Sequence, residues 1–322
     1  MQPEPGTARI DVVVPVHGGW RHVRECLESL DRQTIPVRVI VVDDRSPDDT
    51  LTRVRDAFPH LTVLANQENL GFSASCNRGI REGSSPFIVL LNSDVVADPD
   101  LARRVLDAFE TGGDSVGSVA PILLTAEGTV DSYGVSADVT GAGYVRFHGA
   151  PLHRVHPNLP SLLGPYGAAA GYRRDALDQV GLLDERIFMY GEELELAFRL
   201  RAGGWQAKAV SAVVGTHIGG ASAGKASARQ LYLSGFGRGY FLRVYGVLRS
   251  RYGLRAVISE SIVVVVWTLA RRDLTAWRGR RDGWRAGRGV ARRPIAADAA
   301  DPRIGFWRSL RMRRAGYWTS AS

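Results

Sequence analysis

Short β-branched runs alternate with amphipathic segments in the N-terminal part of the chain, and this alternation constrains the fold more than any other feature. Strand patterns occur at 9–16, 37–44, 61–66, 87–94 and 115–124. Helical patterns lie between them at 20–32, 72–82 and 99–110, and in a further segment that Ser46 is expected to cap. Strands and helices that alternate with short loops form βαβ units, so we predict an α/β fold with a mostly parallel sheet flanked by helices.

Carboxylates follow two of these strand patterns directly. Asp43 and Asp44 end the second strand, and Asp94 ends the fourth. Ligands of parallel α/β sheets bind at the carboxyl ends of the strands, which makes these acids candidate site residues. The first turn reads HGG and lacks the spacing of a dinucleotide-binding loop, so a dinucleotide site is not supported.

A second group of acids opens the helix that we predict at 192–202. Glu192, Glu193 and Glu195 lie within four positions. A carboxylate crowded by like charge holds its proton more tightly, which suits a general base, although acids at a helix start also favour the helix dipole. A Gly-, Pro-, Tyr- and His-rich stretch at 125–165 is expected to form a loop-and-hairpin insertion near the site. A last strand is expected to end at His217.

Six segments occur in one order: VVVPVHGG, VVDDRSPDDT, NLGFSASCNRGI, LLNSDVVADPD, YGEELELAFRLRAGGW and THIGGAS. Together they resemble the inverting family 2 glycosyltransferases of GT-A fold, and within them the bacterial rhamnosyltransferase-like branch. The resemblance covers about residues 8–225. It implies a GT-A type sheet flanked by helices, and an enzyme that moves a sugar from a nucleotide-diphosphate sugar to a hydroxyl group.

The resemblance also implies a donor site. Asp44 would bind the nucleotide base, because a carboxylate accepts from the N3–H of uracil or thymine. The backbone of Pro15, Val16 and His17 would line the base pocket. The segment with Asn69 and Gly71 would border the nucleotide and diphosphate. For Asn77, a place at this border and a place on a polar helix face are both open.

The family's Asp-x-Asp metal motif corresponds to Asn92-Ser93-Asp94, so its first acid is missing here. The resemblance therefore implies Asp94 as the main carboxylate for Mg²⁺ or Mn²⁺, with Asn92 and Ser93 beside it in the donor site. One carboxylate with substrate phosphates and water is adequate for Mg²⁺, and Mn²⁺ would accept His217 as a further ligand.

The family's acid pair corresponds to Glu192-Glu193. Glu193 is the expected base, and Glu192 is expected to orient the acceptor or the loop. We expect a dTDP- or UDP-linked donor, dTDP-rhamnose or another deoxysugar among them, and a glycan, lipid-linked or small-molecule acceptor. Two alternatives are a nucleotidyltransferase, which would want a lysine-bearing phosphate loop, and a non-catalytic sugar-nucleotide-binding scaffold, which the missing first acid at Asn92 would suit.

Charge divides the chain into a catalytic domain at 1–230 and a basic, aromatic-rich helical region at 231–322. Residues 230–322 carry 19 arginines and 5 acids, and five tryptophans lie among them. This composition suits an anionic membrane surface, while packing against the catalytic domain or in a homodimer remains open and nucleic acid is the weaker alternative. The apolar run Ile262–Ala270 is too short to span a membrane. The chain has only two cysteines, so no disulfide framework is expected, and we find no signal-peptide pattern. Both observations favour the cytoplasm.

Overall fold

The structure is a computed structural model that describes residues 8–157, 159–218, 227–314 and 316–320. Its large sheet contains β1 (Ile10–Val16), β2 (Arg38–Asp43), β3 (Thr62–Ala65), β4 (Phe87–Leu91), β5 (Val95–Ala97), β6 (Val116–Thr125), β7 (Val130–Ser132), β10 (Ala169–Arg173) and β11 (Gln206–His217). The strand order is β3-β2-β1-β4-β10-β6-β11-β5, with β7 paired to β6. The pairs β1–β2, β1–β4, β2–β3 and β6–β11 are parallel, and β10, β5 and β7 run the opposite way.

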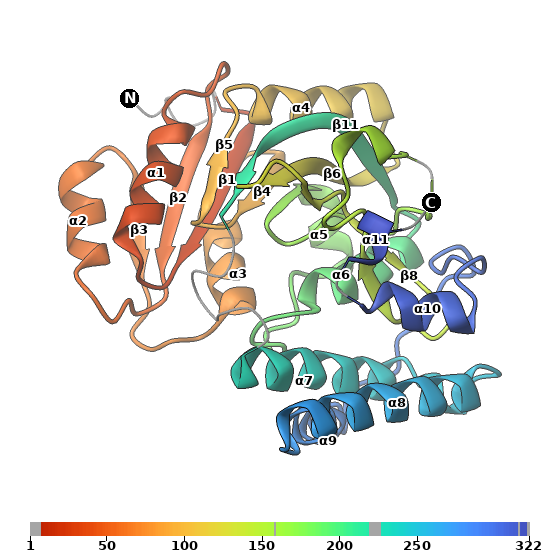
Figure 1. The fold of residues 1–322 in the computed structure, drawn as a ribbon. Coiled ribbons are helices and arrows are strands. Elements are labelled where there is room, and N and C mark those ends of the chain that lie inside the picture. Colours follow the sequence, from red (N-terminus) through yellow and green to blue (C-terminus); the bar gives the residue numbers. More distant parts are fainter. Residues whose placement is uncertain (1–7, 158, 219–226, 315, 321–322) are drawn as a thin grey trace.

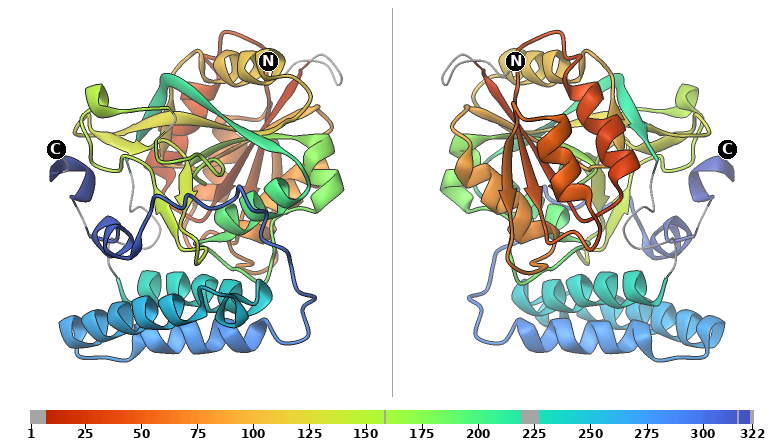
Figure 2. Two further views of the ribbon diagram at one scale, coloured as in Figure 1. Left: turned by 90° about the vertical axis from the view of Figure 1, so that its right-hand side faces the viewer. Right: turned by 90° about the vertical axis from the view of Figure 1, so that its left-hand side faces the viewer.

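Helices cover both faces of this sheet (Figures 1 and 2). One face carries α1 (Trp20–Leu30), α2 (Thr50–Ala57) and α4 (Leu101–Gly112), and the other carries α3 (Phe72–Glu82), α5 (Arg174–Val180) and α6 (Glu192–Ala202). The period of two in β1 explains both contacts, because Val12 and Val14 join the first core and Val13 joins the second. Strands buried on both faces read as continuous apolar runs, which is why the sequence predicts them well.

The structure corrects two of the sequence predictions. Residues 169–173 are not among the predicted strands, but they form β10 between β4 and β6 in the centre of the sheet. Ser46 does not cap α2, whose N-cap residue is Asp49. Instead, the Ser46 hydroxyl donates to Asp43, and Gly18 N donates to Ser46 Oγ at 2.7 Å, which holds the turns after β2 and β1 together.

The expected insertion after β6 is present. It contains β8 (Val135–Ala137) and β9 (Gly143–Val145), which pair as an antiparallel hairpin, followed by the 3₁₀ turn η1 (Leu152–Arg154). Tyr144 of β9 is buried, and its hydroxyl lies 2.5 Å from Ser309 Oγ in the C-terminal region. The hairpin therefore connects the sheet to the end of the chain.

The C-terminal region is helical, as predicted. It consists of α7 (Ala228–Val244), the 3₁₀ turn η2 (Val247–Arg249), α8 (Gly253–Arg271), α9 (Thr275–Ala286), α10 (Phe306–Met312) and α11 (Tyr317–Ser320). In Figures 1 and 2, α7, α8 and α9 form a layer beside the α/β body, and α10 and α11 return toward β8. Helix α7 starts at Ala228 and so includes the predicted domain boundary at residue 230, and the two-domain division stays a prediction.

Helix α8 corrects the expectation for the apolar run Ile262–Ala270. That run is the second half of a helix of 19 residues, which is long and apolar enough to cross a membrane by length and composition alone. Only 22% of the apolar stretch of this helix is buried inside the protein. The surroundings of the helix therefore decide how it can contact a membrane.

Glycines allow α7 and α9 to pack with their backbones in close approach. A Cβ atom at Gly239 of α7 would lie 2.0 Å from the carbonyl oxygen of Arg280, and one at Gly283 of α9 would lie 1.9 Å from that of Phe236. Real Cβ atoms do not approach a carbonyl oxygen this closely, so any side chain at these positions forces the helices apart. Each helix has a second glycine four residues earlier: Gly235 in α7 and Gly279 in α9.

We predict that Gly283→Ala separates α7 from α9 and lowers the free energy of unfolding by about 1–3 kcal/mol, the usual cost of overpacking. The matched control is Gly305→Ala, where a Cβ would meet no atom within 4 Å and the backbone φ is −66°. Thermal unfolding followed by circular dichroism measures both. Equal melting temperatures for the two variants would contradict the close helix contact.

Candidate functional site

One cavity of about 550 Å³ lies at the carboxyl ends of β1, β2, β4 and β11 and at the start of α6. Asp43 and Asn77 do not line it, but the other site residues predicted from the sequence do: Pro15, Val16, His17, Asp44, Asn69, Gly71, Asn92, Ser93, Asp94, Glu192, Glu193 and His217. These residues are spread over two hundred positions of sequence. The parallel strands bring them together because their carboxyl ends meet at one edge of the sheet.

Asp44 links two loops of this cavity. The side chain is buried; Oδ1 accepts hydrogen bonds from Leu70 N and Asn66 Nδ2, both at 2.8 Å, and Oδ2 accepts one from Gly71 N at 2.8 Å. A carboxylate offers about four acceptor directions, so these three bonds leave capacity for one further donor, on Oδ2. Asp43, by contrast, accepts from Ser46 N and the Ser46 hydroxyl and serves the turn after β2.

Asn77 lies outside the cavity lining. The side chain is 1% exposed, its amide donates to the Leu183 carbonyl oxygen at 2.8 Å, and its own oxygen accepts from Leu183 N at 3.0 Å. Asn77 therefore holds the loop that precedes α6, and its place at the border of the nucleotide stays a prediction. Gly219, Gly220 and Ser222, which belong to the last of the six segments, lie outside the described residues.

The acid pair opens α6. Glu192 is 4% exposed, whereas Glu193 is half-buried and its Oε2 accepts from Gly191 N at 3.1 Å. Gly191 has φ 100°, a conformation that glycine adopts without strain and that turns the chain sharply into the helix. As a result, both carboxyl groups reach the cavity from one helical turn.

Burial and the local environment affect the pKa of the two acids differently. Burial raises the pKa of Glu192 well above its usual range, and the charge of Glu193 raises it further. Burial also raises the pKa of Glu193, but backbone N–H groups at the helix start oppose that shift. When a close pair of carboxyl groups shares one proton, the more deeply buried group retains it. Glu192 therefore holds the proton, and Glu193 is the member of the pair that ionises first.

His217 lies between two carboxylates. Its Nε2 is 3.1 Å from Asp94 Oδ1, and its Nδ1 is 2.9 Å from Asp131 Oδ2. Burial disfavours the charged imidazole, yet the hydrogen bonds that it donates to Asp131 and Asp94 raise the pKa of His217 to about 9. Asp131, on β7, was not predicted; only its position in the Gly-rich insertion pointed to this region.

The donor set suits a divalent ion with few protein ligands. No group of three or more His, Cys, Asp or Glu side chains among the described residues is arranged to hold an ion. Asp94 and His217, however, present an oxygen and a nitrogen 3.1 Å apart in the same cavity, and a divalent ion could replace the proton between them. The two residues fit such an ion if substrate oxygens and water supply the remaining ligands.

The C-terminal region closes the other side of the cavity. Met312, Arg313, Arg314, Gly316 and Trp318 line it, together with Arg229 and Gln230 from the start of α7. These residues put positive charge opposite the carboxylates, and the sequence analysis missed them. No local pattern marks such a return, because it depends on how the helices between 227 and 305 fold back.

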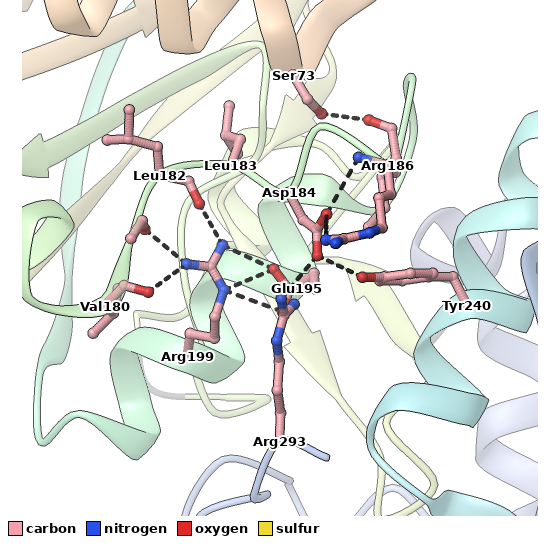
Figure 3. A network of polar contacts seen from close by, with 12 residues as sticks. Ser73, Val180, Leu182, Leu183, Asp184, Arg186, Glu195, Arg199, Tyr240 and Arg293 are labelled. Carbon is pink, nitrogen blue, oxygen red and sulfur yellow. Dashed lines mark hydrogen bonds and ion pairs between the residues drawn. The ribbon is translucent and has the colours of Figure 1, made fainter. Parts of the chain in front are cut away.

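A buried ion-pair network holds α6 from behind (Figure 3). Glu195 is fully buried and pairs with Arg199 at 2.9 Å and with Arg293 from the C-terminal region. Arg293 also pairs with Asp184 at 2.9 Å, which accepts from the Tyr240 hydroxyl of α7 at 2.6 Å. Arg199 donates to carbonyl oxygens of the loop before α6, among them Leu182 at 2.7 Å. The network therefore joins α6, its preceding loop, α7 and the segment after α9.

That same loop contacts the side of the cavity formed by Gly71 and the start of α3. Phe72 N donates to the Phe188 carbonyl oxygen at 2.8 Å, and the Ser73 hydroxyl donates to that of Ile187 at 2.5 Å. A Cβ at Gly71 would lie 2.6 Å from the Phe188 ring, so Gly71 is required where the loop crosses the start of α3. Displacing the network would shift the acid pair and the Asn69–Gly71 loop together.

The comparisons with known proteins agree with this geometry. The family model described as Glycosyl transferase family 2 matches residues 11–181. The N-acetylglucosaminyl-diphospho-decaprenol L-rhamnosyltransferase of Mycobacterium tuberculosis is 28% identical over 221 residues, which are 61% of this chain and 71% of that protein. The O-antigen biosynthesis protein RfbC of Myxococcus xanthus is 28% identical over 63% of this chain and 16% of its own length.

Solved structures share the fold at low identity. The mannosyltransferase PcManGT of Pyrobaculum calidifontis, in complex with GDP-Man and Mn²⁺, aligns with a TM-score of 0.51 and 15% identity over 88% of this chain and 89% of that one. TarS 1–349 of S. aureus, in complex with UDP-GlcNAc, aligns with a TM-score of 0.53 and 14% identity over 87% and 92%. The α/β architecture with helices on both faces is thus one that glycosyltransferases use.

We predict that Arg293→Ala lowers the free energy of unfolding by about 3–5 kcal/mol, because it removes one partner from two buried carboxylates. The control is Arg292→Ala, one position earlier on an exposed side chain. Urea unfolding measures both variants. A loss in Arg293→Ala no larger than in Arg292→Ala would contradict the role of the network.

Proposed function

The chain belongs to glycosyl transferase family 2, and from this premise we propose that it is an inverting enzyme that uses a dTDP- or UDP-linked sugar and an acceptor hydroxyl. One observation carries the proposal: a single cavity joins the strand-end residues of a nucleotide site to a buried pair of carboxyl groups. A non-catalytic scaffold would not need that pair, whose burial is costly for folding. The match to glycosyl transferase family 2 argues against the alternative of a nucleotidyltransferase.

In the proposed mechanism, Glu193 is the general base. Its carboxylate, fixed by Gly191 N, takes the proton from the acceptor hydroxyl, which attacks the anomeric carbon from the face opposite the nucleotide. Glu192 stays protonated and can donate a hydrogen bond to the acceptor. A divalent ion at Asp94 and His217 would neutralise charge on the departing diphosphate. Asp131 would keep the imidazole oriented, as carboxylates commonly do for metal-bound histidine.

The donor nucleotide is proposed from Asp44. Its remaining acceptor direction on Oδ2 suits the N3–H of a pyrimidine, and Pro15, Val16 and His17 line the same cavity. The deoxysugar, dTDP-rhamnose or a related donor, is proposed from the similarity to the mycobacterial rhamnosyltransferase. The proposed acceptor is a glycan or lipid-linked hydroxyl in the synthesis of a cell-wall polysaccharide. The proposed location is the cytoplasm, at the inner face of the cell membrane. That the protein forms a homodimer also stays a prediction.

The test of this function is donor hydrolysis or transfer across a panel of UDP-, dTDP- and GDP-sugars. We expect the pyrimidine nucleotide diphosphates to bind more tightly than GDP, because a purine presents a different edge to Asp44. Tighter binding of GDP than of both UDP and dTDP, measured by calorimetry, would reject the base assignment.

Glu193→Gln should lower the transfer rate by about 10²–10⁴-fold and leave nucleotide binding close to wild type. The amide keeps the size of the side chain but cannot accept the proton. The control Glu28→Gln alters an exposed acid of α1 and should have no effect. Turnover assays and calorimetry with the nucleotide diphosphate separate the two quantities. A Glu193→Gln enzyme that turns over at the wild-type rate would exclude Glu193 as the base.

Removal of divalent ions with EDTA should abolish transfer, and Asp94→Ala should weaken binding of Mn²⁺ and with it activity. The physical reason is the loss of the carboxylate that anchors the ion next to the diphosphate. Electron paramagnetic resonance of Mn²⁺ measures binding independently of turnover, with Asp100→Ala as the control. Full activity in excess EDTA would exclude metal dependence. Unchanged Mn²⁺ affinity in His217→Ala would remove only that ligand.

A further inference from the structure

One side of α8 exposes apolar side chains that nothing in the described structure covers. We call the set the α8 face: Leu254, Val257, Ile258, Ile262, Val265, Val266 and Leu269. Leu254 and Leu269, at its two ends, are 75% and 73% exposed. The residues recur every three or four positions, so they share one side of the helix. Apolar patches of this extent on a protein surface mark a binding surface.

The α8 face continues onto neighbouring elements. Leu274 and Trp277, at and after the turn into α9, are 48% and 44% exposed. A shallow apolar groove of about 340 Å³ runs between α8 and α9, and Val257, Val265 and Trp277 are among its lining residues. The exposed apolar surface is therefore broader than a single row of side chains.

Ion pairs hold the opposite side of α8 against the rest of the protein. Glu260 is buried and pairs with Arg238 of α7 at 2.8 Å, Arg280 of α9 at 2.9 Å and Arg313 at 3.2 Å. Burial alone would raise the pKa of Glu260, but the three guanidinium groups hold it well below its usual range. The carboxylate is thus charged, and α8 cannot leave the body without separating a buried ion and three partners.

These ion pairs determine the orientation in which α8 can contact a membrane. A spanning orientation would carry Glu260 and its arginines into hydrocarbon, where unsolvated charge is expensive. An orientation parallel to the membrane plane keeps the ion pairs inside the protein and immerses only the α8 face.

The charged residues around the α8 face indicate which kind of partner binds it. Exposed arginines lie at both ends of α8: Arg249 and Arg251 precede it, Arg271 is its last residue and Arg272 follows, with Asp273 paired to Arg271. Basic residues around an apolar helix face complement anionic lipid head groups. A second copy packed antiparallel through α8 would place the arginines at one end of α8 against those at the other end of its partner helix, which disfavours a homodimer through this face.

We propose that α8 is an in-plane anchor whose apolar face inserts into the interface of an anionic phospholipid bilayer. This deepens the proposed function, since it names the surface by which the enzyme reaches a membrane that holds a lipid-linked acceptor. Glu260 and its three arginines, one of which lines the active-site cavity as Arg313, connect the anchor to the site.

The test is flotation of the full chain with vesicles of phosphatidylglycerol and phosphatidylcholine. Wild type should float with the anionic vesicles. The double variant Val265→Asp, Leu269→Asp should bind about a hundredfold less, because each apolar side chain removed from the interface contributes about tenfold. The control Leu152→Asp, Leu159→Asp makes the same change at two exposed leucines outside the C-terminal region and should bind like wild type. Circular dichroism establishes that the variants are folded.

Three results would overturn the anchor. They are wild type that stays in solution at low salt, a double variant that floats like wild type, and a lipid-free dimer that the double variant dissociates. Quenching of Trp277 by brominated lipid on vesicle addition supports insertion, and its absence contradicts it. Transfer to a water-soluble acceptor should be unchanged in the double variant. If wild type transfers no sugar to any acceptor, the proposed function fails while the vesicle experiment still tests the anchor.

Discussion

The buried network around Glu195 is the interaction on which the rest of the site depends. Glu195 is fully buried one turn after the start of α6, and it is paired with Arg199, four residues later on the same helix, and with Arg293 from the C-terminal region. Removing one partner from such a cluster leaves charge in a medium of low polarity, so the loop before α6, α7 and the segment after α9 must assemble together. The C-terminal region is therefore structurally coupled to α6, the helix that carries the acid pair.

This rigid support explains how two carboxyl groups can remain close at the start of α6. Burial penalises ionisation of both, and the pair relieves the repulsion by sharing one proton, which Glu192 holds. Glu193, at the more exposed position and with Gly191 N as donor, is left as the ionised member. The difference between the two acids thus comes from depth in the cavity rather than from residue type. From the sequence, the division of roles followed only from the resemblance to the family.

The sequence predicted the elements whose pattern is local. Helices at 72–82 and 192–202 and the strand ending at His217 are confirmed, because apolar periodicity and glycine boundaries define them within a few residues. Strand β10 was missed because Ala169 and Ala170 carry no strand preference, and only pairing with β4 and β6 makes them a strand. The length of α8 was misjudged because Glu260 interrupts its apolar pattern, and the return of Trp318 to the cavity depends on tertiary packing alone.

The pH dependence of kcat/KM in Glu192→Gln tests the division of roles within the acid pair most directly. If Glu192 already holds a proton when Glu193 ionises, the amide is a close substitute. Turnover should then stay within about tenfold of wild type. The acidic limb should stay above the usual carboxyl pKa of about 4.3, because activity is lost as pH falls through the raised pKa of Glu193. Loss of turnover as severe as in Glu193→Gln would contradict the account and make Glu192 the base.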